Sequence, residues 1–293
     1  MEVTRTATTG RHRGGAGTTP TVKILFIGDI VGKPGRTLVR DAVRRLVEHW
    51  DIDLVVANVE NAAGGNGITR ETGEAIRDAG VEVMTSGNHI WDKREALGYI
   101  EMEPRLLRPA NYPAAPGHGH LVVEARDGTP VAVVNLMGRV FMAPLDNPFA
   151  VADALLAELR ERAAVILVDF HAEATSEKIA MGWHLDGRVS AVVGTHTHVQ
   201  AADERILPEG TAYITDVGMT GPHDSVIGVE KGVVLQRFRT SMPARFDTAT
   251  GDVRLHAVVV TVAAESGRAT AIDRLSLTPA DIEALGRAHA SRP

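Results

Sequence analysis

The segment VKILFIG, residues 22–28, decides the fold of this sequence. Its apolar residues run without interruption into a glycine, which is typical of a β-strand that is buried on both faces. The loop DIVGKPG (29–35) follows, and residues 36–49 then place apolar side chains at helical spacing with arginine and glutamate between them. Strand, loop and helix therefore form the first structural unit.

The same unit recurs along the chain. LVVANV (54–59) predicts a second strand, and Thr69 is suited to cap a helix that runs to about Ala79. VEVMTS (81–86) predicts a third strand. Strands that alternate with helices of this length imply right-handed crossovers and parallel pairing.

The rest of the chain is richer in strands. HLVVEA (120–125) and VAVVNL (131–136) flank an Asp127-Gly128 turn, which indicates an antiparallel hairpin. Further strands are predicted at 164–170, 189–194, 211–216, 232–238 and 253–263, and helices at about 149–162 and 176–185. We therefore expect an α/β fold in which two mixed β-sheets pack as a sandwich flanked by helices.

The composition is that of a globular protein and limits the classes of function. The chain has 293 residues, of which 44% are hydrophobic and 23% charged, and its formal net charge of -6 argues against broad electrostatic capture of nucleic acid. It contains no cysteine, so any metal ion must be held by nitrogen and oxygen ligands. No apolar run approaches the ~20 residues that span a bilayer, and we expect a cytoplasmic protein without a membrane partner.

Residues 1–21 differ from the rest of the sequence. This leader is rich in glycine, threonine and arginine and shows no apolar periodicity, so we expect it to be disordered. A nucleic-acid-binding arm is the alternative interpretation of its arginines. Residues 22–293 contain no repeat or linker and are expected to form one domain.

Residue types that bind metal ions follow five of the predicted strands, at their carboxyl ends. Ligands of open α/β sheets bind at this edge. The residues are Asp29, Glu60, Asn61, Asn88, His89, His171, His196 and His198. Taken singly, each has a structural explanation as a turn, cap or hydrogen-bonded loop residue.

His196 and His198 form the most suggestive pair, because alternate positions on an extended chain point the same way and suit chelation. Five strand ends with such groups on one edge make independent coincidence a poor explanation. Two carboxylates, two amides and three histidines besides His89 are about what two metal ions need once water and bridging ligands are added.

The order of these motifs resembles a known superfamily. GD (28–29), NVEN (58–61), GNH (87–89), FH (170–171) and THTH (195–198) are similar to the motifs of the calcineurin-like metallophosphoesterases. The longer stretches KILFIGDIVGKPGR, NVENAAGGNGIT, SGNHIWDK, DFHAEATSEK, GTHTHVQ and TDVGMTGP resemble the YmdB family of bacterial 2',3'-cyclic nucleotide phosphodiesterases. The resemblance covers essentially all of Val22 to Val262.

The resemblance implies a ligand set for two metal ions. Asp29, Glu60, Asn61 and His198 would hold the first ion, and Glu60, Asn88, His171 and His196 the second, with Glu60 as the bridge. Val31 stands where the superfamily has a histidine ligand, and Asn61 supplies the compensating oxygen by resemblance. The more oxygen-rich site favours iron or manganese over zinc.

The resemblance also implies the reaction. A hydroxide that bridges the metals would attack phosphorus of a small 2',3'-cyclic nucleotide, and His89 would protonate the leaving ribose oxygen. RNA ends that carry a 2',3'-cyclic phosphate are an alternative substrate, and a homo-oligomer is compatible with the sequence. Asp216 or His223, in the loop TDVGMTGPHDS (215–225), could line the substrate pocket, although buried turn hydrogen bonding explains Asp216 equally well.

Two other classes of function compete with this interpretation. A phosphomonoesterase or protein phosphatase on the same scaffold would differ in its leaving group and pocket shape. A metal-binding regulatory protein would keep the fold without depending on turnover. The complete ligand set weighs against a regulatory protein, because such a protein has no evident need for an open site with two metals.

Overall fold

The structure of the protein is a computed structural model that describes residues 20–290, with side chains described as far as residue 286. Most of the predicted leader, residues 1–19, therefore lies outside the described residues. Its last two residues belong to the fold. The carbonyl oxygen of Pro20 accepts a hydrogen bond from Ala264 N at 2.9 Å, and Thr21 opens the first strand opposite Ala263.

The first β-sheet has seven strands in the order β2-β11-β12-β1-β3-β4, with β13 paired to β12. Its strands are β1 (Thr21–Ile27), β2 (Asp29–Ile30), β3 (Leu54–Asn58), β4 (Val83–Thr85), β11 (Met219–Pro222), β12 (Val253–Ala263) and β13 (Ala269–Leu277). The β1, β3 and β4 strands pair in parallel, whereas β12 is antiparallel to β1. The sheet is therefore mixed, as expected.

The second β-sheet has six strands in the order β5-β6-β7-β8-β10-β9. Its strands are β5 (His120–Glu124), β6 (Pro130–Met137), β7 (Val165–His171), β8 (Ala191–Thr195), β9 (Arg205–Ile206) and β10 (Ala212–Ile214). β5 and β6 form the predicted antiparallel hairpin, and β6, β7, β8 and β10 run parallel.

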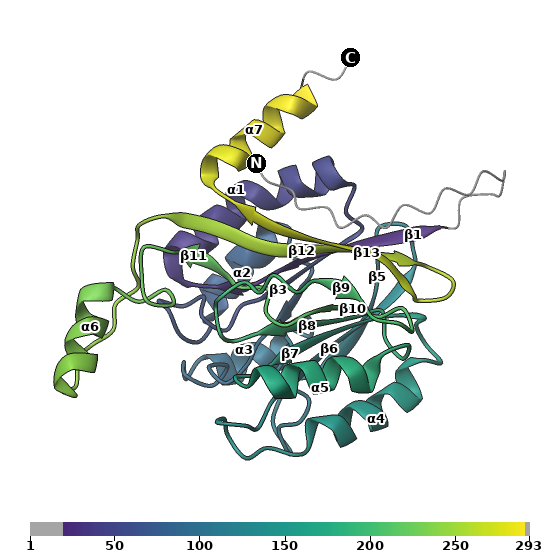
Figure 1. The fold of residues 1–293 in the computed structure, drawn as a ribbon, viewed down its shortest axis with the longest axis horizontal. Helices are drawn as coiled ribbons and strands as arrows, with labels where there is room; N and C mark the ends of the chain where they lie inside the picture. Colours follow the sequence, from purple (N-terminus) through teal and green to yellow (C-terminus); the bar gives the residue numbers. More distant parts are fainter. Residues whose placement is uncertain (1–19, 291–293) are drawn as a thin grey trace.

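Helices α1 (Gly32–Trp50), α2 (Arg70–Asp78), α3 (Ala96–Met102) and α7 (Pro279–Ala290) cover the outer face of the first sheet, and α4 (Pro148–Leu159) and α5 (Thr175–Leu185) cover that of the second (Figure 1). Helix α6 (Lys231–Thr240) covers neither sheet. Thr69 caps α2 with the expected hydrogen bond from Thr72 N to its side chain. No helix among residues 20–290 is long and apolar enough to cross a bilayer.

Three apolar cores lie between the layers of helices and sheets. One lies between the first sheet and α1, α2, α3 and α7, another lies between the two sheets, and the last lies between the second sheet and α4 and α5. Alternate residues of β1 divide between two of these cores: Leu25 and Ile27 face the helices, and Ile24 and Phe26 face the other sheet. The predicted two-sheet sandwich flanked by helices is confirmed.

The strand predicted at 232–238 is wrong, because these residues belong to helix α6. The Glu230 side chain accepts a hydrogen bond from Val233 N at 3.0 Å and caps the helix, and Arg237 and Arg239 lie in its last turn, where cations are favoured. Figure 1 shows α6 standing out from the body of the molecule, so no strand lies beside it to pair with.

The sequence analysis also missed several elements. β13 and α7 follow β12 near the C-terminus, and α3 follows β4. β13 has buried residues interrupted by one or two partly or fully exposed ones, and it pairs antiparallel with β12 along most of its length. Its apolar residues are separated by charged ones, which gives a weaker signal than the continuous apolar run of a buried strand.

The core between the sheets allows a prediction about the stability of two matched variants. Phe26 is fully buried, whereas Phe238 on α6 is 81% exposed. Phe26→Ala should lower the free energy of unfolding by about 3–5 kcal/mol, and Phe238→Ala should change it by less than about 0.5 kcal/mol. Urea denaturation followed by circular dichroism measures both values. A small effect of Phe26→Ala would mean that the two sheets do not pack as described.

Candidate active site

The predicted site residues gather where the two sheets meet at one edge. Asp29 in β2, Glu60 and Asn61 after β3, and Asn88 after β4 come from the first sheet. His171 is the last residue of β7, and His196 and His198 follow β8, so the imidazoles come from the second sheet. The carboxyl ends of strands from both sheets thus supply one cluster.

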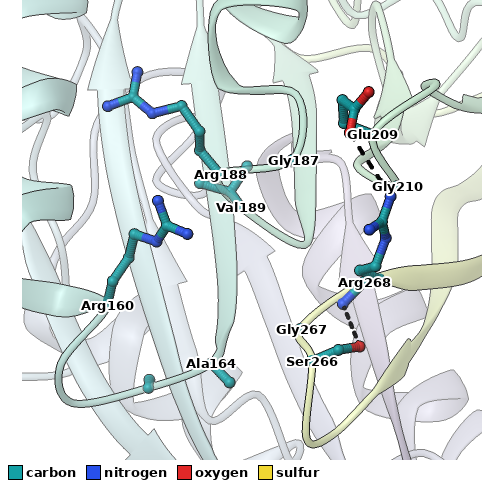
Figure 2. Close-up of a pocket in the computed structure, with 11 residues that line it drawn as sticks. Arg160, Ala164, Gly187, Arg188, Val189, Glu209, Gly210, Ser266, Gly267 and Arg268 are labelled. Atoms are coloured by element: carbon teal, nitrogen blue, oxygen red, sulfur yellow. Dashed lines mark hydrogen bonds and ion pairs between the residues drawn. The ribbon is translucent and has the colours of Figure 1, made fainter.

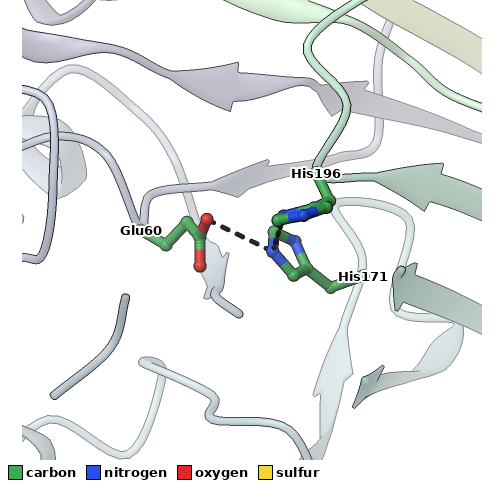
Figure 3. Close-up of side chains that lie close together, drawn as sticks. All are labelled: Glu60, His171 and His196. Carbon is green, nitrogen blue, oxygen red and sulfur yellow. Dashed lines mark hydrogen bonds and ion pairs between the residues drawn. The ribbon is translucent and has the colours of Figure 1, made fainter. Parts of the chain in front are cut away.

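Four side chains meet at the centre of this cluster. His171 Nε2 lies 3.0 Å from Asn88 Oδ1, 3.0 Å from His196 Nδ1 and 3.2 Å from Glu60 Oε1. Figure 3 shows the two imidazole rings side by side, with the Glu60 carboxylate pointing at them. Glu60, His171 and His196 form a group that could hold a metal ion.

The spacing of these atoms suits ligands of one cation. His171 Nε2 can donate at most one hydrogen bond, yet it faces three polar atoms within 3.2 Å. Ligands bound at about 2.1 Å and at right angles lie roughly 3 Å apart, so the observed contacts have the separation expected around a metal ion. The residues present therefore fit a bound metal.

The electrostatics of the cluster also favour a cation. Although burial opposes it, the charge and hydrogen bond of His171 lower the pKa of Glu60 to about 2. Burial lowers the pKa of His171, but the Glu60 and Asp29 carboxylates outweigh it and raise this pKa to about 9. Burial and the neighbouring His171 lower the pKa of His196 to about 3, which keeps this imidazole neutral and able to bind a metal.

A second group of predicted ligands lies beside the first. His198 Nε2 is 3.2 Å from Asn61 Oδ1, and His198 Nδ1 donates to the carbonyl oxygen of Ile227 at 2.9 Å, which leaves Nε2 free to act as a ligand. Asp29 Oδ2 accepts a hydrogen bond from His196 N at 3.3 Å. Asp29 is fully buried, burial raises its pKa, and its Oδ1 has no hydrogen-bond partner within residues 20–286. A buried carboxylate oxygen without a donor fits a cation site.

The THTH segment differs from the expected extended chain. His196 and His198 both have positive φ angles, of 101° and 65°. The two rings therefore do not point the same way from one strand. His196 turns toward His171 and His198 turns toward Asn61, so each histidine reaches a different group of ligands.

Two residues that the sequence analysis missed orient His171. Thr195 Oγ1 donates to Asp169 Oδ1 at 2.7 Å and lies 2.9 Å from His171 Nδ1. The hydroxyl proton is committed to Asp169, so Thr195 accepts from the Nδ1–H of His171, and Nε2 is left as the ligand atom. Burial raises the pKa of Asp169 to about 6. A carboxylate inside the apolar strand VILVDF was the available signal.

Close packing at Gly87 gives His171 its position. A Cβ atom at residue 87 would lie 2.2 Å from His171 Nε2, which is far inside van der Waals contact. Any side chain here would displace the ring, so the GNH motif needs its glycine for space.

Asp216 lies in a buried ion pair and not on an open pocket wall. It is 2% exposed, and Lys178 Nζ donates to its Oδ2 at 2.6 Å. The same oxygen accepts from the backbone N and the hydroxyl of Thr197, at 3.1 and 2.7 Å. The Lys178–Asp216 pair therefore anchors the segment that carries His196 and His198, which favours the structural interpretation of Asp216 over a substrate contact.

His89 and His223 lie outside the ligand group. The backbone N of His89 donates to Glu60 Oε2 at 3.0 Å, while its ring contacts Asp92 at 2.7 Å. His223 donates from Nδ1 to the carbonyl oxygen of Gly221 at 3.0 Å, and its ring lies 4.5 Å from that of His256. Burial lowers the pKa of His223, and its Nε2 has no partner within residues 20–286.

A separate pocket lies at the opposite ends of the strands (Figure 2). It has a volume of about 190 Å³, and its lining includes Arg160, Arg188 and Arg268, which precede the starts of β7, β8 and β13. Arg188 pairs with Asp153 at 2.7 Å, and Arg268 lies 4.0 Å from Glu209. This pocket offers no grouping of histidine and carboxylate ligands, so the candidate active site is at the other edge.

The model of the YmdB-like protein family matches residues 25–275. The chain belongs to this family. The YmdB resemblance inferred from the motifs is therefore confirmed. The chain is 49% identical over 255 residues to the 2',3'-cyclic-nucleotide 2'-phosphodiesterase of Bacillus subtilis strain 168, an alignment that covers 87% of this chain and 96% of the relative.

Two solved structures of similar proteins share the fold. A novel phosphatase from Mycoplasma pneumoniae is 33% identical, with a TM-score of 0.84 and coverage of 91% of this chain and 98% of that one. A hypothetical protein from Thermus thermophilus is 44% identical, with a TM-score of 0.81 and coverage of 87% and 99%. The YmdB-like fold therefore extends over nearly the whole length of both relatives.

Breaking the buried Lys178–Asp216 pair should cause a measurable loss of stability. Lys178→Met leaves the buried carboxylate without its partner and should lower the free energy of unfolding by about 3–5 kcal/mol. Lys231→Met is the matched control, because Lys231 pairs with Asp224 at the exposed surface and should contribute less than about 1 kcal/mol. Thermal unfolding measures the stability of both variants, and metal analysis should show weaker metal binding only for Lys178→Met. Equal effects of the two substitutions would contradict the anchoring role.

Proposed function

We propose that this protein is a phosphodiesterase that uses two metal ions to hydrolyse 2',3'-cyclic nucleotides. The observation that carries the proposal is the convergence of Glu60, Asn88 and His196 on His171 Nε2, at 3.0–3.2 Å, at the edge where the two sheets meet. The buried, unpartnered oxygen of Asp29 and the Asn61–His198 contact beside it support a second cation site.

Membership of the family establishes the general type of activity. The chain is an enzyme that hydrolyses phosphoric diesters, because it belongs to the YmdB-like family and is 49% identical to a named phosphodiesterase over 96% of that relative. The relative acts on 2',3'-cyclic nucleotides according to its name. We extend this substrate to the present chain, with RNA ends that carry the same cyclic phosphate as an alternative. A homo-oligomer stays a prediction.

Two metal ions would be held by the predicted residues. We assign Asp29, Glu60, Asn61 and His198 to the first ion and Glu60, Asn88, His171 and His196 to the second, with Glu60 as the bridge. When bound, such ions supply a hydroxide nucleophile at neutral pH and neutralise the phosphoryl oxygens. Carboxylate and amide oxygens outnumber imidazoles at the first site, which favours iron or manganese.

The remaining residues act on the leaving group and the substrate. Opening a 2',3'-cyclic phosphate expels a ribose oxygen that needs a proton. We assign this proton to His89, whose backbone is tied to Glu60 and whose side chain is 36% exposed and therefore accessible to substrate. His223 remains a proposed substrate contact, whereas its predicted companion Asp216 is assigned to holding the histidine segment.

The proposal is tested by removing and restoring metal. Chelated enzyme should lose turnover of 2',3'-cyclic AMP and regain it with manganese or iron(II). Glu60→Gln removes the bridging charge and should abolish turnover together with binding of both ions, as measured by metal analysis. Turnover that is indifferent to chelation would overturn the metal mechanism. Faster hydrolysis of nucleoside monophosphates than of cyclic nucleotides would favour a phosphomonoesterase.

The substitution His89→Ala tests whether His89 is a proton donor or a metal ligand. The variant should bind both metal ions as the wild type does, because His89 lies outside the ligand group, while kcat for 2',3'-cyclic AMP falls by about 10²–10⁴-fold. Metal analysis and steady-state kinetics on the same preparation provide the two measurements. Loss of metal along with activity would make His89 a ligand.

A further inference from the structure

The imidazole of His89 is held by a carboxylate outside the ligand cluster. Its Nδ1 lies 2.7 Å from Oδ2 of Asp92, three residues further along the same turn. The side chains of His89 and Asp92 are 36% and 34% exposed, so both are in contact with solvent. With Nδ1–H donated to Asp92, the ring offers Nε2 as its free nitrogen.

Asp92 is itself fixed by the glycine-rich loop ENAAGGNG, residues 60–67. Nδ2 of Asn66 donates to the same Oδ2 of Asp92 at 2.9 Å, and Lys93 Nζ donates to Asn66 Oδ1 at 3.3 Å. One carboxylate oxygen thus accepts hydrogen bonds from both His89 and Asn66. A partly exposed carboxylate would otherwise sample several rotamers, and the second donor restricts it to the one that meets His89.

The glycine at position 67 explains how the loop comes so close to Asp92 and Lys93. Ala63 N donates to the carbonyl oxygen of Gly67 at 2.9 Å and closes the loop. Gly67 has a φ of +74°, and a Cβ atom there would lie 2.8 Å from Lys93 Cγ and 3.3 Å from Asp92 Cβ. A residue with a side chain would therefore push the loop away from Asp92 and separate Asn66 from it.

We propose that Asp92 and the glycine-rich loop, through Asn66, position His89 for proton transfer to the leaving oxygen. The inference deepens the proposed function and rests on it. In the reaction, the bond from phosphorus to the ribose oxygen breaks as a bond to a water-derived oxygen forms. The departing oxygen takes the Nε2 proton of the doubly protonated His89 ring, whose Nδ1–H stays on Asp92, and the ring then regains a proton at Nε2 from solvent. Asp92 touches neither phosphorus nor the leaving oxygen and is a positioning residue.

Comparing the loss of kcat on two substrates with different leaving groups distinguishes a positioning role of Asp92 from a merely structural one. Asp92→Ala should lower kcat for 2',3'-cyclic AMP by about 10–100-fold, because a ribose oxygen needs protonation and its donor is no longer oriented. The loss should be below roughly threefold for bis(p-nitrophenyl) phosphate, whose phenolate departs without a proton. KM and metal content should stay close to those of the wild type.

Two further variants sharpen this test. Asp92→Asn keeps an oxygen that can accept from both donors and should recover part of the lost kcat. Asn66→Ala should show the same dependence on the leaving group with a smaller loss, because Asp92 still contacts His89. Asp153→Ala is the matched control: it removes a comparable His–Asp contact, at 2.9 Å from His184, and should leave the kinetics unchanged.

Equal losses on both esters, loss of metal, or full activity of Asp92→Ala would overturn the positioning role. The proposed function is judged separately, by whether wild-type enzyme hydrolyses 2',3'-cyclic AMP at all. Should it fail to do so, phenyl and p-nitrophenyl esters of one nucleoside monophosphate replace the pair of substrates. The positioning role then requires that Asp92→Ala slows the phenyl ester more than the p-nitrophenyl ester.

Discussion

Buried charge between the two sheets is the constraint on which the site depends. Asp29 begins β2, Glu60 follows the end of β3 in the first sheet, and both are almost completely buried, while His171 ends a strand of the second sheet. Carboxylates removed from water need a compensating positive charge, which an imidazolium or a metal ion can supply. The apolar core between the sheets, which includes Phe26, holds these opposite partners at the same edge.

A layer of hydrogen bonds orients each group of functional side chains. Asp169 and Thr195 fix the ring of His171, and Ile227 fixes that of His198. The Lys178–Asp216 pair anchors Thr197, which lies between His196 and His198. These partners are buried or lie in loops packed against the site. Because catalysis needs ligands placed to within a fraction of an ångström, such supporting contacts carry as much of the function as the ligands.

The fold could be predicted wherever the sequence pattern is strong. The β1 strand is a continuous apolar run, and Thr69 carries a recognisable cap, so strand and helix boundaries there were close to those observed. At 232–238 the apolar residues suit a strand equally well, and only the Glu230 cap and the lack of a neighbouring strand decide for helix α6. β13 mixes polar and apolar residues without a continuous apolar run and gave too weak a signal.

The sequence by itself determined which residue types stand at the strand ends, and hence the family and the chemistry of the candidate ligands. Tertiary structure alone decided their arrangement: the left-handed backbone of His196 and His198 sends their rings to different ligands, and Asp216 is committed to Lys178. It also brought Asn66 to Asp92 across 26 residues of chain. Such contacts depend on packing between distant segments, which local pattern and spacing do not encode.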